Sequence, residues 1–284
     1  MTATVADILA ALDAIAPFSL AESWDNVGLM VGAPRMPVHA IHLGLDPSPD
    51  LLTEAKAAGA NLLITHHPAI FRPLKSIRTD RAEGQFLATA LRDNLAVVGV
   101  HTNLDVIRGG VSTVLATRLG LERLAPLAPR SPAAPETGFG QIGTLPAPLE
   151  GQAFLRMSLH ALGLPVLAVA GPLPSTVRTV AVCGGSGSDL AETAKSMGAD
   201  LYLSAEIKHN VARWAEAEGF CVIDAGHYAT EVHSVAVLAD LLRQSLEKRG
   251  VAVPITTTSK QTNPFTHYVN VANGISQLSM RCVP

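Results

Sequence analysis

Two adjacent histidines, His66 and His67, follow an apolar stretch, residues 62–65, that reads as a buried strand. Successive side chains on a strand point to opposite faces, so a regular strand would bury one imidazole and expose the other. Pro68 interrupts the regular backbone directly afterwards, and both rings can then face one cavity. Imidazole nitrogen is a common ligand for divalent transition metals. A pair of histidines can equally be two solvated surface residues, so this pair alone leaves both interpretations open.

A second predicted strand, residues 95–101, ends in the same kind of side chain. His101 is its last residue, and Asp105 follows shortly afterwards. Ligands in open α/β sheets gather outside the carboxyl ends of the strands. If the two strands are neighbours, we expect His101 and Asp105 to share one crevice with the histidine pair.

A third predicted strand, residues 220–226, repeats this design near the other end of the chain. Gly226 permits a sharp turn, His227 follows it, and Glu231 stands at the start of a long helix predicted for residues 231–248. A carboxylate in the first turn of a helix is favoured by the helix dipole, so capping alone could account for Glu231. Capping does not account for the histidine at the same strand end.

These residue types match the preferences of borderline divalent metals. Such ions bind neutral imidazole nitrogen and carboxylate oxygen, and a carboxylate can bridge two of them. Because three histidines and two carboxylates are many ligands for one ion, we predict two divalent transition-metal ions (Zn, Fe, Mn, Co or Ni). Paired ions clamp the attacking and leaving oxygens of hydrolytic reactions.

Three other stretches are compatible with chemistry but do not require it. Glu206, Lys208 and His209 follow a predicted strand and either line the cavity or form a solvated helix start. The glycine-rich residues 184–189 lack the pattern of a phosphate-binding loop. They fit an anion site at a helix start or, more simply, a tight turn. Residues 24–26, Trp-Asp-Asn, read as an ordered loop.

The predicted site depends on strands and helices that alternate along the chain. Nearly all-apolar strands between amphipathic helices indicate mostly parallel sheets covered on both faces. Residues 125–150 are rich in proline and glycine, which indicates a boundary segment or a long surface excursion. We therefore predict two α/β domains, residues 1–124 with the first two strand ends and residues 151–284 with the third. The first helix is predicted at residues 5–15.

The composition limits the classes of function. Hydrophobic residues make up 48% of the 284-residue chain and charged residues 16%, which is typical of a globular protein and not of a disordered one. The net charge of −3 and the lack of a basic cluster give no electrostatic case for binding nucleic acid or anionic membranes. Neither a signal peptide nor a transmembrane helix is expected. Cys183, Cys221 and Cys282 read as reduced thiols, so we predict a cytoplasmic protein.

Taken together, the motifs resemble those of the dinuclear metal-centre hexameric protein family, often called GTP cyclohydrolase I type 2 homologues. The shared stretches cover nearly the whole chain and are, in order, SWDNVGLMVG, ITHHPAIF, VGVHTNLD, GFGQIGTLP, CGGSGSD, DLYLSAEIKHN, DAGHYATE and TNPF. The resemblance implies two α/β domains per subunit, a toroidal homohexamer and a two-metal site facing its interior. It implies that the metal ligands are the three histidines and two carboxylates His66, His67, Asp105, His227 and Glu231, with His101 supporting them or taking part in catalysis.

The chain departs from this family at a few positions that border the predicted cavity. Ala205 and Asn210 stand where many relatives have a glycine and a second histidine, and Gln141 stands where arginine is common. The chain is also too short for the extra middle domain of longer members. These differences bear on substrate preference.

Two classes of function fit these features. One is a metal-dependent hydrolase of a small substrate, in which His101 or Glu206 moves protons. The resemblance implies a nucleotide or purine, although a phosphoesterase or amidohydrolase would use the same ligands. The alternative is a non-enzymatic hexamer that binds metal and acts in regulation or as a scaffold. A metal-free domain with scattered surface histidines accounts less well for three similar strand ends.

Overall fold

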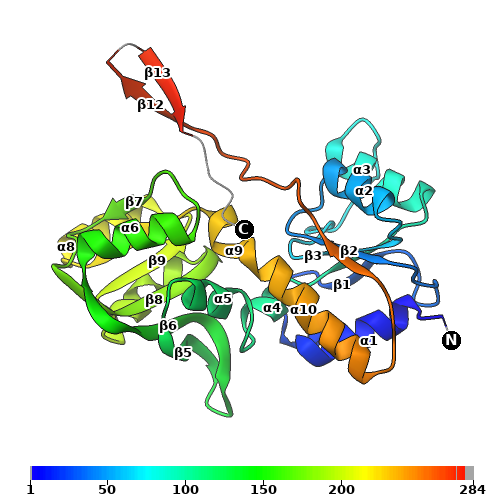
Figure 1. The fold of residues 1–284 in the computed structure, drawn as a ribbon, viewed down its shortest axis with the longest axis horizontal. Helices are drawn as coiled ribbons and strands as arrows, with labels where there is room; N and C mark the ends of the chain where they lie inside the picture. The colour runs from blue at the N-terminus through cyan, green and yellow to red at the C-terminus, as the bar shows by residue number, and fades with distance from the viewer. Residues whose placement is uncertain (1, 273, 279–284) are drawn as a thin grey trace. The chain divides into compact units, whose positions relative to one another are not determined.

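The computed structural model describes residues 2–272 and 274–278, and the contacts within it divide the chain into two units. The first unit comprises Met1–Leu104 and Val235–Gln261, and the second comprises Asp105–Ser234 and Thr262–Pro284. These bounds differ from the predicted 1–124 and 151–284 because the chain returns to the first unit after residue 234. The elements of both units are labelled in Figure 1.

A five-stranded sheet forms the centre of the first unit, in the order β1-β4-β3-β2-β11. Neighbouring strands are parallel from β4 to β11, and only β1 is antiparallel to its neighbour. The sheet is therefore mostly parallel, as predicted. Its strands are β1 (Gly28–Val31), β2 (Ile41–Gly44), β3 (Leu62–Thr65), β4 (Ala96–Gly99) and β11 (Ile255–Thr257).

Helices cover both faces of this sheet. In Figure 1, α2 and α3 lie over one face and α1 and α10 over the other. Leu63 belongs to the apolar cluster beneath α2 and α3, while its neighbours Leu62 and Ile64 point to the opposite face and are also fully buried. The helices are α1 (Val5–Ile15), α2 (Pro49–Ala57), α3 (Ala82–Arg92), α4 (Thr102–Asp105) and α10 (His233–Lys248), with a 3-10 turn at Phe18–Leu20. The unit boundaries fall inside two of these helices, so α4 belongs to the first unit as far as Leu104 and α10 belongs to it from Val235 onward.

Local sequence signals determine where α1 and α2 begin. The Thr4 N–H donates to Asp7 Oδ2 at 2.8 Å, and the Asp7 N–H donates to Thr4 Oγ1 at 3.4 Å. This capping box satisfies amide groups that the first helical turn leaves without partners. The Leu51 N–H donates to Ser48 Oγ at 3.2 Å, and Pro49 occupies the first position of α2. The predicted helix at 5–15 is confirmed.

Val235–Gln261, the second segment of the first unit, contacts residues of the first segment that are far away in the sequence. Ile255 of β11 lies opposite Ile41 of β2. The Ser259 N–H and Oγ–H both donate to Glu54 Oε1 at 2.9 Å. The Arg249 guanidinium donates to the Ala10 carbonyl at 2.9 Å. Because periodicity reports only on local structure, it does not reveal this return.

A six-stranded mixed sheet forms the centre of the second unit, in the order β5-β6-β8-β9-β10-β7. Only β8, β9 and β10 are parallel, and the other three pairs are antiparallel. The expected mostly parallel arrangement is therefore wrong for this sheet outside its centre. The strands are β5 (Glu122–Ser131), β6 (Ala134–Glu150), β7 (Ala168–Ala170), β8 (Thr176–Ser186), β9 (Leu201–Ala205) and β10 (Cys221–Asp224).

Residues 125–150, which read as a boundary or surface excursion, form most of β5 and β6. Proline lacks an N–H donor and is tolerated at sheet edges and at bulges. Pro126 and Pro129 lie in β5, which is an edge strand. Pro146 and Pro148 lie in β6 where its pairing register with β8 shifts. The prolines therefore mark an edge and an irregularity rather than a loop.

Helices of the second unit contribute to one apolar cluster on each face of its sheet. Leu201 and Leu203 join the cluster that includes Phe154 of α6, and Tyr202 between them joins the cluster that includes Ala215 of α8. This alternation is that of a strand covered on both faces. The helices are α5 (Val111–Arg118), α6 (Gly151–Ala161), α7 (Ala191–Ser196), α8 (His209–Ala217) and α9 (His227–Glu231), with a 3-10 turn at Ser188–Leu190.

The chain continues into a separate antiparallel hairpin, formed by β12 (His267–Val271) and β13 (Gly274–Leu278). Cys183 and Cys221 are buried free thiols, and Cys282 lies outside the described residues. None of the helices formed by residues 2–272 and 274–278 is long and apolar enough to cross a membrane.

Candidate metal centre

The three histidines that follow β3 and β4 come together in the first unit. His66 and His67 leave β3 at its carboxyl end, and His101 follows the parallel neighbour β4. The ring centroids are 5.1 Å apart for His66 and His67, 5.1 Å for His66 and His101, and 5.6 Å for His67 and His101. One ring nitrogen of each lies within 4.8 Å of one from each of the others. Two adjacent strands thus deliver three imidazoles to one point.

His66 and His67 are held in fixed orientations through their Nδ1 atoms. The His66 Nδ1 lies 2.9 Å from the carbonyl oxygen of Val100, and the His67 Nδ1 lies 2.7 Å from Oδ1 of Asp46. A carbonyl or ionised carboxylate oxygen only accepts hydrogen bonds, so Nδ1 is the donor in both rings. Nε2 is then the nitrogen that can coordinate an ion.

His101 is oriented in the same way by Asp25, whose side chain is fully buried. Asp25 Oδ1 lies 2.9 Å from the His101 Nδ1, and its Oδ2 accepts from the Thr102 N–H at 3.1 Å and the Thr102 hydroxyl at 2.5 Å. Burial alone would raise the pKa of Asp25, but the hydrogen bonds from His101 and Thr102 outweigh it and hold this pKa well below its ordinary 3.8. The carboxylate therefore stays ionised at neutral pH and fixes the tautomer of His101.

A residue from the far end of the chain holds the backbone of Asp46. Oε1 of Gln261 accepts from the Leu45 N–H at 2.6 Å and from the Asp46 N–H at 3.4 Å. Its Nε2 donates to the Asp46 carbonyl at 2.5 Å. Gln261 thus fixes the residue that orients His67.

In the second unit, His227 and Glu231 stand at the two ends of α9. Their i, i+4 spacing places them on one face of the helix, with the His227 Nε2 3.0 Å from Oε2 of Glu231. On the other side of the ring, the His227 Nδ1 lies 2.9 Å from Oε1 of Glu206. Glu231 is only 3% exposed, so a buried carboxylate faces the nitrogen of an oriented imidazole. Glu206 has a φ of 53°, which is uncommon for a residue other than glycine.

The glycine-rich turn closes tightly against this pair. Gly185 has a φ of +66°, and a Cβ there would lie 2.2 Å from Oε1 of Glu231 and 3.2 Å from Nε2 of His227. The Gly185 N–H donates to Thr230 Oγ1 at 3.0 Å. Residues 184–189 therefore do more than turn the chain, because a glycine is needed there to leave room for the carboxylate.

Asp105 is the last residue of α4 and the first of the second unit. In that unit its negative charge, like that of Glu231, affects the pKa of the Cys183 thiol. Burial above all, together with the negative charges of Asp105 and Glu231, raises the pKa of the Cys183 thiol to about 12. The Cys183 thiol is therefore uncharged at neutral pH. The negative charges that act on it belong to the Asp105 and Glu231 carboxylates.

Two functional residues were not assigned a role from the sequence. Asp46 follows β2, the neighbour of β3, so it stands at one more strand end and carries the same signal as His66 and His101. Asp25 lies in an irregular loop, and no local pattern connects it with His101.

Lys208 and His209 form the start of α8, with the Lys208 ammonium 2.7 Å from Oδ1 of Asp189.

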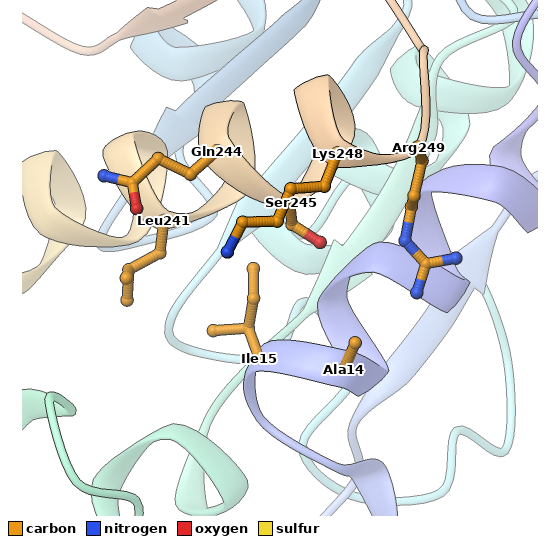
Figure 2. Close-up of a pocket in the computed structure, with 7 residues that line it drawn as sticks. All are labelled: Ala14, Ile15, Leu241, Gln244, Ser245, Lys248 and Arg249. Carbon is orange, nitrogen blue, oxygen red and sulfur yellow. The ribbon is translucent and has the colours of Figure 1, made fainter.

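The cavity between α1 and α10 lies elsewhere in the first unit (Figure 2). It has a volume of about 410 Å³ and is lined by Ala14, Ile15, Leu241, Gln244, Ser245, Lys248 and Arg249. Because no histidine or carboxylate lines it, this cavity lacks the donors of a metal site.

The donor atoms of both units fit divalent ions of the predicted kind. Metal-binding histidines usually donate their other ring N–H to a carboxylate or a backbone carbonyl. His66, His67, His101 and His227 all have such an acceptor at Nδ1. The donors are imidazole nitrogen and carboxylate oxygen, which suit Zn, Fe, Mn, Co and Ni.

The profile of one protein family, Duf34/NIF3 (NGG1p interacting factor 3), matches residues 3–264. The chain belongs to the DUF34/NIF3 family. It is 34% identical to a Streptomyces coelicolor protein over 93% of this chain and 94% of the relative. It is 31% identical to a Clostridium acetobutylicum protein over 93% and 99%. Both relatives are named GTP cyclohydrolase 1 type 2 homolog, which confirms the resemblance found from the motifs.

Solved structures of this family share the mixed α/β fold. A hypothetical protein of Staphylococcus aureus matches with a TM-score of 0.89 and 26% identity, over 94% of this chain and all of that one. A Bacillus cereus protein related to NIF3 matches with a TM-score of 0.88 and 25% identity, over 93% and 99%.

Proposed function

We propose that this DUF34/NIF3 protein is a metal-dependent hydrolase of a small substrate. Its two divalent transition-metal ions would be held by His66, His67, Asp105, His227 and Glu231. The observation that carries the proposal is the convergence of three imidazoles whose Nδ1 atoms are all held by acceptors. His66 and His67, held in this way, are prepared to coordinate through Nε2 at little cost in side-chain entropy, and the same support directs Nε2 of His101 toward them.

Bound divalent ions would lower the pKa of water and polarise the oxygen of a carbonyl or phosphoryl group. The chain supplies the remaining functions. The ionised Asp25 orients His101 with Nε2 as its basic nitrogen, so His101 is the residue we assign to proton transfer. Glu206 accepts the hydrogen bond of the His227 Nδ1, so we assign it to positioning that ring.

The substrate class rests on the relatives. The proteins from Streptomyces coelicolor and Clostridium acetobutylicum are named homologs of GTP cyclohydrolase 1 type 2. We therefore propose a nucleotide or purine as substrate and ring-opening hydrolysis as the first reaction to test. A phosphoesterase or amidohydrolase reaction would use the same donors and belongs in the same screen.

The test is hydrolysis by metal-supplemented protein of GTP, phosphate monoesters and cyclic amides. Asp105→Ala should abolish turnover without changing the oligomeric state. Asp189→Ala is the matched control, because this carboxylate of the same unit is 82% exposed and pairs only with Lys208 in the described part of the chain. Metal retention with no turnover on any substrate would contradict the hydrolase and favour a metal-binding regulatory or scaffold protein.

We also propose that the protein assembles as a toroidal homohexamer. The hairpin β12–β13 and the residues before it expose large apolar side chains, among them Phe265 (72%), Tyr268 (64%) and Ile275 (78%). An isolated two-stranded hairpin is marginally stable in water, so packing against another copy would stabilise it. Sedimentation should give about six times the chain mass of 29.7 kDa, and a mass of one chain would contradict the assembly.

A further inference from the structure

Two large aromatic side chains of the first unit lie exposed beside the histidine cluster. Trp24 is 59% exposed and Phe71 is 44% exposed. Their ring centroids are 6.0 Å apart with the ring planes at 68°. The His101 ring lies 6.3 Å from the Trp24 ring and 6.2 Å from the Phe71 ring. The three rings thus form a corner, with the residue assigned to proton transfer, His101, as one of its sides.

The loop that carries Trp24 is anchored on both sides of this residue. Asp25 accepts hydrogen bonds from His101 and Thr102, and the Glu22 N–H donates to Thr102 Oγ1 at 2.9 Å. Asn26 Nδ2 donates to the carbonyl of Ile70 at 2.6 Å, directly before Phe71. The hydrogen bonds therefore tie the two aromatic segments to each other and to the segment that follows β4. Exposed aromatic surface in a fixed arrangement is a typical feature of a ligand-binding site.

The charges in the segment that carries Phe71 favour an anionic ligand, because the Asp25 carboxylate beside Trp24 is already bound by His101 and Thr102. Arg72 directly follows Phe71, and Lys75 stands three residues later, both with exposed side chains. Aromatic rings also bind cations, but the two positive charges that follow Phe71 in the sequence disfavour a cationic ligand. A planar ring with a phosphate or another acidic group satisfies both the aromatic surface and the positive charge.

We propose that Trp24 and Phe71 bind the planar heteroaromatic ring of an anionic substrate, such as the base of a nucleotide. The ring would stack on one aromatic side chain and contact the other with its edge. This places the ring beside His101 and the histidine pair, where its bonds can be hydrolysed. The inference rests on the proposed function for this last step, but the stacking itself does not require a metal.

The test measures binding by chelator-treated, full-length protein, so that activity plays no part. Isothermal titration calorimetry with GMP, AMP and ribose 5-phosphate compares wild type with Trp24→Ala, Trp24→Phe and Phe71→Ala. We expect both nucleotides to bind and ribose 5-phosphate to bind far more weakly. Trp24→Ala should weaken nucleotide binding roughly 5- to 150-fold, the range that loss of one base–aromatic stack produces, and Trp24→Phe should restore most of it.

A second readout uses the two tryptophans of the chain, Trp24 and Trp214. In a Trp214→Phe variant, GMP should quench the fluorescence of Trp24. Ile77→Ala is the matched control, because Ile77 is an exposed apolar residue (55%) of the same unit and should leave GMP affinity unchanged.

Four results would overturn the inference, three of them in the binding data. These are no nucleotide binding at millimolar concentration, equal binding of ribose 5-phosphate, or unchanged affinity in Trp24→Ala. A lower oligomer mass in Trp24→Ala would also overturn it, because the aromatic pair would then be a contact between copies. If the protein bound nucleotides but retained no metal after supplementation, the hydrolase proposal would be contradicted and the stacking site would still be supported.

Discussion

The orientation of each histidine in the first unit depends on one acceptor behind its ring. Val100 supplies a carbonyl oxygen to His66, whereas Asp46 and Asp25 supply carboxylates to His67 and His101. A carboxylate at Nδ1 fixes the tautomer, limits rotation of the ring and increases the basicity of Nε2. The affinity of these histidines for a metal ion would therefore depend on residues that do not touch the ion.

Asp46→Ala tests this dependence. Loss of the carboxylate should leave the fold intact but weaken metal binding about 10- to 100-fold, because the His67 ring is no longer oriented. Competition with a chelator of known affinity measures the change. Asp50→Ala, an exposed carboxylate in the first turn of α2, is the control and should retain wild-type affinity. Equal affinities in the two variants would contradict the role of Asp46.

His42 should make the stability of the protein depend on pH. Burial lowers the pKa of His42 below its ordinary 6.5, although the Glu54 carboxylate, 3.9 Å away, acts in the opposite direction. As the pH falls through about 6.5, His42 takes up a proton in the unfolded chain but stays neutral in the folded one. Stability is therefore present above this pH and is lost below it, by at most about 1.4 kcal/mol per pH unit.

The measurement for His42 is the free energy of unfolding in urea at about pH 7.5 and about pH 5.5. Wild type should lose more stability between these values than His42→Asn. Glu54 does not confuse the comparison, because its pKa is lowered from 4.5 and it stays ionised throughout this window. An equal loss in both proteins would show that His42 titrates alike in the folded and unfolded states.

At the scale of elements, the second unit brings a strand end and a short helix into close contact. The last residues of β8 pass so near α9 that only a glycine at position 185 leaves room for Glu231. This explains why the glycine-rich turn and the His227–Glu231 helix occur in the same chain, although neither motif predicts the other from its sequence.

Gly185→Ala should displace Glu231 and weaken metal binding by at least about 10-fold, as loss of a ligand's support does. Gly198→Ala is the matched control, because Gly198 also has a positive φ (+80°) but has nothing within 4 Å of an added Cβ. Both variants carry the cost of a left-handed alanine, roughly 1–2 kcal/mol. If metal affinity fell equally in both, backbone strain and not the Glu231 contact would be the cause.

Secondary-structure elements were predictable where the sequence signal was local, and they were not predictable where they depend on contacts between distant residues. The apolar strands 62–65 and 95–101 and their terminal histidines follow from residue order, because the carboxyl ends of parallel neighbours must meet. The prolines of β5 and β6 made these strands read as a boundary segment or surface excursion, since proline at a sheet edge or a bulge cannot be told from proline in a loop by sequence alone. Asp25 could not be assigned, because its partner His101 is set by the tertiary fold.

At the scale of the whole molecule, the two units are not consecutive in sequence. β11 returns to pair with β2, and Gln261 at the end of this return holds Asp46. No contiguous division such as 1–124 and 151–284 captures this, since long-range pairing is invisible to composition. Family membership, in contrast, was predictable, because eight motifs in the correct order are far more specific than any one of them.

Elemental analysis tests most directly whether the DUF34/NIF3 protein binds the proposed pair of divalent metal ions. Wild type purified without chelator would be measured beside Asp105→Ala and Glu231→Ala, with Asp189→Ala as control. We predict about two equivalents of a transition metal in wild type and control, as a two-metal site requires, and a large loss in the other two variants. Wild-type protein that holds no metal even after supplementation would contradict a dinuclear metal centre.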